Sequence, residues 1–131
     1  MDAAINQRPL RVFLVEDSPH VRDLLLDFLH VPGEVEIIGY ADTEDDSVAA
    51  ILAEPVDAVI VDLKLKEGSG MAVIERLRKA NLIPSPKLIV FTNHPFPEIK
   101  QRAMKLGADY FFDKSADYDS VRTTLQALRA T

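Results

Sequence analysis

The sequence contains no cysteine, so it can form neither a disulfide nor a thiolate metal site. It has no apolar run approaching about 18 residues, which predicts no membrane-spanning helix. Its first nine residues lack the apolar segment of a secretory signal. Basic residues are scattered through a chain of formal net charge -6, which argues against a nucleic-acid-binding surface. The absence of cysteine also fits a reducing compartment, and we expect a cytoplasmic protein.

The length and the apolar content suit one compact domain. The chain has 131 residues, of which 47% are hydrophobic, and this is enough for a substantial core but leaves little room for a second domain. We expect residues 1–9 to form a flexible N-terminal tail and residues 10–131 to form the domain.

Short apolar runs alternate with segments of helical periodicity along the whole of that domain. The predicted strands contain residues 10–15, 35–40, 59–61, 87–91 and 108–112. The segments between and after them carry apolar residues at helical spacing, within 21–29, 48–52, 73–77, 99–106 and 121–128. Five strand–helix units in succession predict a doubly wound α/β fold, in which helices cover both faces of a five-stranded parallel sheet.

Several turns carry specific helix signals. Ser18 and Pro19 suit the N-cap and the first position of a helix, and Gly107 suits the residue that follows a helix end. The stretch 68–70, Gly-Ser-Gly, could suggest a phosphate-binding loop, but it lacks the Lys-Ser/Thr ending of a P-loop. We therefore expect a turn there, in which Ser69 caps the next helix.

Polar side chains follow four of the five predicted strands at the point where each strand ends. They are Glu16 and Asp17, Asp62, Thr92 and Lys114. Because the carboxyl ends of parallel strands share one edge of the sheet, we expect these side chains to lie together. Three carboxylates held close together need a positive partner, and a hard divalent cation such as Mg²⁺ is the natural one.

The same set of residues suits phosphoryl chemistry. An aspartate such as Asp62 can act as a nucleophile and form an aspartyl-phosphate. Mg²⁺ and Lys114 would stabilise charge on the phosphoryl oxygens, and Thr92 could donate a hydrogen bond to them. Taken singly, each acid could equally be a solvated loop residue or a helix cap, but the complete set favours a functional site.

These residues resemble the receiver domains of two-component response regulators. Besides the acidic pair, the matching positions are Asp62 in Val-Asp-Leu-Lys-Leu, Gly70 in the loop after it, Thr92 in Val-Phe-Thr and Lys114 in Tyr-Phe-Phe-Asp-Lys. Asp62 follows Asp17 by 45 residues, Thr92 follows Asp62 by 30, and Lys114 follows Thr92 by 22. The resemblance covers about residues 10–130. It implies the flavodoxin-like or CheY-like (βα)5 fold with strand order 2-1-3-4-5.

The resemblance also implies roles for individual residues. Asp62 would accept a phosphoryl group from a sensor histidine kinase or a histidine phosphotransfer protein. Mg²⁺ would be bound by Asp17, by Asp62 and by the backbone carbonyl of Lys64, while Glu16 would act through a metal-bound water. Lys114 would pair with Asp62 and then with its phosphoryl group.

Further implied roles concern the switch. Thr92 would turn toward the phosphoryl group, and Phe111 occupies the place of the switch aromatic whose rotamer follows that movement. Lys64 and His94 stand where the family tunes hydrolysis of the aspartyl-phosphate, although they could equally be two solvated loop residues. Phosphorylation would then shift a two-state equilibrium and change partner binding or dimerisation.

The sequence departs from the family pattern at four positions. Lys66 and Ser115 stand where the family often has proline, Phe111 replaces tyrosine, and Asn93 replaces a smaller residue. Asn93 and Ser115 leave room for an alternative, a pseudo-receiver that acts as a phosphate-independent interaction module.

We expect a signalling domain that catalyses only its own phosphorylation and dephosphorylation, rather than an enzyme acting on an outside substrate. An aspartate-nucleophile phosphatase would need a second aspartate two residues after the first, where Lys64 or Pro19 stands. A flavin-binding domain would need a phosphate-cradling loop where Glu16 and Asp17 would repel phosphate.

The resemblance implies where protein partners bind. The kinase or phosphotransfer protein would meet the first helix, around residues 21–25. A second copy or a downstream effector would meet the face formed by the fourth and fifth helices and the fifth strand. No contact with nucleic acid or membrane is expected of the domain itself. The sequence fits both a stand-alone receiver and a part of a longer regulator.

Overall fold

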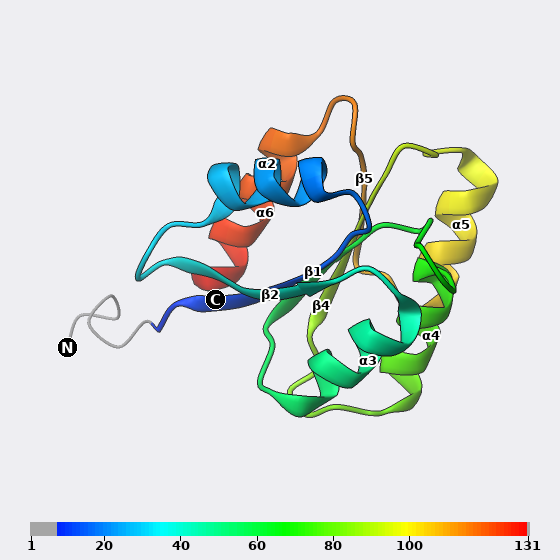
Figure 1. Ribbon diagram of the computed structural model, residues 1–131, viewed down its shortest axis with the longest axis horizontal. Coiled ribbons are helices and arrows are strands. Elements are labelled where there is room, and N and C mark those ends of the chain that lie inside the picture. Colours follow the sequence, from blue (N-terminus) through cyan, green and yellow to red (C-terminus); the bar gives the residue numbers. More distant parts are fainter. Residues whose placement is uncertain (1–7, 131) are drawn as a thin grey trace.

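The computed structural model describes residues 8–130 and shows one parallel sheet between two layers of helices (Figure 1). The five strands lie in the order β2-β1-β3-β4-β5, which confirms the predicted fold and strand order. Of the predicted flexible tail, residues 1–7 lie outside the described residues. Arg8, which is described, pairs its guanidinium with the carboxylate of Asp57 at 2.7 Å.

The predicted strand–helix units are all present. The strands are β1 (Leu10–Val15), β2 (Val35–Ala41), β3 (Ala58–Val61), β4 (Lys87–Thr92) and β5 (Tyr110–Asp113). The helices are α2 (Pro19–Leu29), α3 (Glu44–Ala53), α4 (Gly70–Lys79), α5 (Pro97–Leu106) and α6 (Tyr118–Ala130). Helices α2 and α6 cover one face of the sheet, and α3, α4 and α5 cover the other (Figure 1).

The central strands are buried on both faces, as their continuous apolar runs predict. Every residue of β3 is buried, and successive side chains enter opposite layers of the core. Val59 and Val61 pack in the layer with α3 and α4, whereas Ala58 and Ile60 pack in the layer with α2 and α6. The residue that follows β3 is therefore held at a rigid point of the sheet.

The start of the fifth strand differs from the prediction of a strand over 108–112. The amide of Ala108 donates to the carbonyl of Ala103 at 3.0 Å and so closes the end of α5. Gly107 makes this closure possible with a positive φ of 120°. Because Ala108 is used by the helix end, the strand begins at Tyr110.

Within α2 and α3, the apolar residues at helical spacing are not all buried. Leu24 and Leu52 are 41% and 46% exposed, while their neighbours Leu25 and Ile51 are almost fully buried. Adjacent helix positions are rotated by about 100° from one another, so one member of each pair points into the core and the other lies at the boundary between the core and solvent.

The helix caps follow the sequence signals. The hydroxyl of Ser18 accepts from the amide of Val21 at 3.2 Å, and the hydroxyl of Ser69 accepts from the amide of Ala72 at 3.1 Å. The Gly-Ser-Gly stretch is thus a capped turn at the start of α4.

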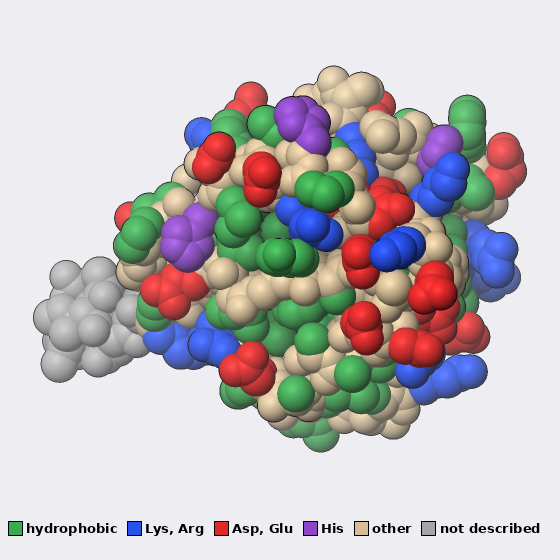
Figure 2. Space-filling view, in the orientation of Figure 1, with side chains coloured by type: hydrophobic (Ala, Val, Ile, Leu, Met, Phe, Trp, Pro, Cys, Tyr) green, Lys and Arg blue, Asp and Glu red, His purple; other side chains and the backbone are tan. Residues whose placement is uncertain are grey.

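Two features of the structure bear on the sequence analysis: the distribution of basic side chains on the surface and the hydropathy of the helices. Figure 2 shows Lys and Arg side chains separated by acidic and apolar side chains on the face that it draws. Within residues 8–130, none of the helices has the length and the hydropathy that a membrane span requires.

Candidate functional site

The carboxyl ends of β1, β3 and β4 meet at one edge of the sheet because their residues pair in parallel register. Val15 pairs with Val61, and Val61 pairs with Val90. The ladder continues beyond β3, where the amide of Asp62 donates to the carbonyl of Val15 at 2.9 Å. The sheet therefore fixes the backbone of Asp62 beside the end of β1.

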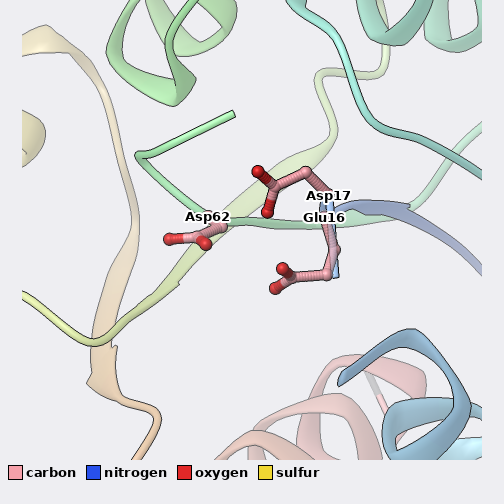
Figure 3. Close-up of side chains that lie close together, drawn as sticks. All are labelled: Glu16, Asp17 and Asp62. Carbon is pink, nitrogen blue, oxygen red and sulfur yellow. The ribbon is translucent and has the colours of Figure 1, made fainter. Parts of the chain in front are cut away.

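Three carboxylates converge at this edge. Glu16 and Asp17 follow β1, Asp62 follows β3, and one carboxylate oxygen from each lies within 4.8 Å of the others (Figure 3). Glu16 and Asp62 are buried, and Asp17 is half-buried. The acidic cluster predicted from the strand ends is therefore present, and Asp17 is its most accessible member.

Lys114 lies against two of these acids. Its Nζ is 2.6 Å from Oε1 of Glu16 and 2.8 Å from Oδ2 of Asp62. The side chains of Lys114, Glu16 and Asp62 are only 6%, 4% and 10% exposed. The contact with Asp62 was predicted, whereas the contact with Glu16 was not.

The pKa values of Glu16 and Lys114 are shifted by burial and by the contacts within the site. Burial raises the pKa of Glu16 above its ordinary value, although the hydrogen bond and the charge of Lys114 oppose this. Burial alone would lower the pKa of Lys114, but its hydrogen bonds to Asp62 and Glu16 outweigh that effect and raise it. Lys114 is therefore a fixed positive charge inside the acidic site.

Thr92 ends β4 and has no exposed surface. Its Oγ1 accepts a hydrogen bond from the amide of His94 at 3.2 Å. A hydroxyl that accepts in this way keeps its own proton for donation. The ring of His94 is stacked on that of Phe96, with centroids 6.4 Å apart, and both residues are exposed.

The loop after Asp62 depends on a glycine. The amide of Gly70 donates to the carbonyl of Leu63 at 2.9 Å. A Cβ at position 70 would collide with the carbonyl oxygen of Asp62 and would lie 2.7 Å from Cα of Leu63. The loop can close over the strand end only because residue 70 has no side chain. Lys64 within this loop is exposed and forms an isolated bridge with Ser69.

The other predicted positions are half-buried or exposed. Phe111 is half-buried in β5, opposite Val90, and packs against the core layer of α3, α4 and α5. Asn93 and Lys66 are exposed. Ser115 is also exposed, but its amide and hydroxyl both donate to the carboxylate of Asp113.

Asp113 was not predicted to contribute. Its position two residues before a serine at a strand end is typical of a turn closed by an aspartate side chain, and that pattern is the signal that could have identified it.

The oxygens of the three acids form a donor set that fits Mg²⁺. The ion prefers a few carboxylates together with water and phosphate oxygens. Glu16, Asp17 and Asp62 supply carboxylate oxygens within a small, partly buried volume. Asp17, the least buried of the three, leaves the cluster partly open to solvent.

The chain is similar to known proteins in sequence and in fold. Residues 12–126 match the family described as the response regulator receiver domain. The protein-glutamate methylesterase/protein-glutamine glutaminase 1 of Syntrophus aciditrophicus (strain SB) is 28% identical over 128 residues. That match covers 92% of this chain but 36% of the relative, so the chain spans about a third of the relative's length.

Two solved structures share the fold. The signal receiver domain of the response regulator NarL from Mycobacterium tuberculosis superposes with a TM-score of 0.84 at 22% identity, covering 94% of this chain and 98% of that one. A response regulator from Chloroflexus aurantiacus superposes with a TM-score of 0.82 at 19% identity, covering 95% and 100%.

Proposed function

The chain belongs to the response regulator receiver domain family, and from this premise we propose that phosphorylation of Asp62 switches it between two signalling states. The observation that carries the proposal is the contact of Lys114 with Asp62 at 2.8 Å beside the acid pair. The proposal is supported because a carboxylate suited to nucleophilic attack, a buried cation and oxygens suited to a metal ion meet at one edge of the sheet.

Each residue then has a defined task. An oxygen of Asp62 attacks the phosphorus of a phosphohistidine, so an O–P bond forms and the P–N bond breaks, with the electron pair leaving on the imidazole nitrogen. Lys114 stays between the attacking carboxylate and Glu16 and stabilises negative charge on the phosphoryl oxygens. The hydroxyl of Thr92 donates to the same group.

Mg²⁺ would be held directly by Asp17, Asp62 and the backbone carbonyl of Lys64, with Glu16 acting through a metal-bound water. When bound, it neutralises charge on the phosphoryl oxygens. The bond of Glu16 to Lys114 at 2.6 Å is compatible with that indirect role.

The switch and its partners are part of the same proposal. Movement of Thr92 toward the phosphoryl group changes the rotamer of Phe111, while Lys64 and His94 set how fast the phosphoryl group is lost. The donor is a sensor histidine kinase or a histidine phosphotransfer protein, and the face of α5, β5 and α6 meets a second copy or an effector. The domain acts in the cytoplasm and transforms no outside substrate.

Intact-protein mass spectrometry after incubation with acetyl phosphate, with and without MgCl₂, tests the proposal. We expect a single hydroxylamine-labile phosphoryl adduct that requires Mg²⁺ and that is absent from Asp62→Asn. Asp57→Asn is the matched control, because the same substitution then falls just before β3, at the opposite end of that strand. It should form the adduct at the wild-type rate.

An adduct that persists in Asp62→Asn would show that another residue is the acceptor. Absence of the adduct from the wild type, together with no binding of beryllofluoride, would favour the pseudo-receiver that carries no phosphate.

A further inference from the structure

We infer that Asp113 and Ser115 form a hydrogen-bonded turn that positions Lys114. This inference deepens the function proposed above and rests on it. The hydrogen bonds of both residues go to partners other than Glu16, Asp17 and Asp62, so both act through the lysine between them. The turn also accounts for serine at position 115.

The turn is closed by the side chain of Asp113. Its Oδ1 accepts from the amide of Ser115 at 2.9 Å and from the hydroxyl of Ser115 at 2.8 Å. The backbone of Asp113 is engaged as well, because its amide donates to Oδ2 of Asp117 at 2.9 Å. Its carbonyl accepts from the amides of Ala116 at 3.1 Å and Asp117 at 2.8 Å.

The other side of Lys114 is tied to the sheet. Asp113 pairs with Thr92 in the β4–β5 register, and the amide of Lys114 donates to the carbonyl of Thr92 at 3.0 Å. The backbone of Lys114 is thus held by the sheet before it and by the turn after it. With its backbone placed in this way, the long side chain reaches both Glu16 and Asp62.

Serine at position 115 supplies a donor that proline lacks. Proline has no backbone N–H and fixes its own φ, so it would shape this turn through its ring. Ser115 presents an N–H and an O–H instead, and Asp113 accepts both. The aspartate–serine pair therefore closes the turn by hydrogen bonds that a proline at position 115 could not donate.

The first test compares Asp113→Ala with Asp113→Asn. The alanine variant removes the acceptor, and we expect adduct formation with acetyl phosphate to slow by between about tenfold and about a hundredfold, as a displacement on the order of 1 Å does. The asparagine variant keeps an oxygen that can accept from Ser115 and should recover most of the rate. Glu75→Ala, which removes one exposed acid from α4, is the charge-matched control and should react like the wild type.

A double-variant cycle separates positioning from a general loss of structure. In a Lys114→Ala background, Asp113→Ala should slow the reaction by less than about twofold, because the group that it positions is already gone. An equal slowing in both backgrounds would overturn the inference.

A second measurement does not depend on phosphorylation. Reductive methylation followed by peptide mass spectrometry reports how accessible the amine of each lysine is. Lys114 should be protected in the wild type and become reactive in Asp113→Ala, while other lysines keep their reactivity. Ser115→Ala, which loses only the hydroxyl bond, should expose Lys114 to a smaller extent.

Protection of Lys114 that is unchanged in both variants would overturn the inference, whether or not the wild type forms an adduct. A wild type that forms no adduct but exposes Lys114 on loss of Asp113 would contradict the proposed function and leave the positioning turn supported.

Discussion

The ammonium of Lys114 is bonded to the carboxylate of Glu16 at 2.6 Å, a shorter contact than its 2.8 Å bond to Asp62. Both acids and the lysine are buried. A buried carboxylate without a cation is costly, so a single ammonium compensates two acids that arise from different strands. Lys114 therefore serves the stability of the fold as well as the chemistry of Asp62.

Replacing this lysine should destabilise the protein. Lys114→Ala leaves Glu16 and Asp62 close together without their shared cation, and we expect the free energy of unfolding to fall by about 3–5 kcal/mol. Urea unfolding in the absence of divalent ions measures it. Adding Glu16→Gln to this variant should restore part of the loss, because it removes one of the two uncompensated charges.

Lys79→Ala is the control for that measurement. Lys79 forms an exposed pair with Glu75 at 3.6 Å, and exposed pairs one helical turn apart contribute only about 0.3–0.5 kcal/mol. If Lys114→Ala were as stable as Lys79→Ala, the shared ion pair would have no structural role.

Asp62→Asn should retain the fold. Asparagine has nearly the same shape, its carbonyl oxygen can still accept from Lys114, and Lys114 keeps its bond to Glu16. We expect the free energy of unfolding to change by about 1 kcal/mol or less, with an unchanged circular dichroism spectrum. Loss of cooperative unfolding in this variant would show that Asp62 is primarily a structural residue.

Gly70→Ala should damage both stability and phosphorylation. The added Cβ collides with the carbonyl oxygen of Asp62 and displaces the backbone that carries the acceptor. We expect the free energy of unfolding to fall by about 1–3 kcal/mol, which is the typical cost of inserting extra atoms into a filled space. Adduct formation should also be slower.

Gly33→Ala is the comparison for this variant. Gly33 has a positive φ of 82°, but a Cβ there would meet nothing within 4 Å. Its substitution should cost about 1–2 kcal/mol through backbone strain alone and leave adduct formation unchanged. Equal slowing of phosphorylation by both substitutions would contradict the importance of the contact with Asp62.

The ionised carboxylate of Asp57 should stabilise the fold at neutral pH and lose this effect in acid. Burial by itself would raise the pKa of Asp57, but hydrogen bonds from the guanidinium of Arg8 and the amide of Arg11 outweigh it and hold the pKa below its ordinary value. The unfolded chain therefore binds this proton at a higher pH than the folded chain does. The stabilisation is complete above the unfolded pKa of about 3.9 and is lost as the pH falls through the lower folded value.

Asp57→Asn should accordingly flatten the decline of stability below about pH 4. Urea unfolding between about pH 2.5 and pH 6 measures this, and Arg8→Ala should show part of the same effect because it removes one of the donors. A decline of the same steepness in wild type and Asp57→Asn would show that other carboxylates govern acid unfolding.

Much of the fold was determined by the sequence alone. The apolar run of β3 predicted a strand buried on both faces, and Asp62 at its end predicted the edge at which the acids meet. Ser18 and Ser69 predicted two helix starts correctly. These signals are readable because burial on both faces, helical spacing and capping are expressed over a few neighbouring residues.

Contacts between segments that are distant in the chain became apparent only in the tertiary structure. The bond between Glu16 and Lys114 joins residues on opposite sides of β3, and the need for glycine at position 70 arises from the carbonyl of Asp62. No local pattern encodes such contacts, because side-chain direction and loop closure are set by what the folded chain brings alongside. The sequence thus determined which residues form the site, and packing alone decided how their charges are shared.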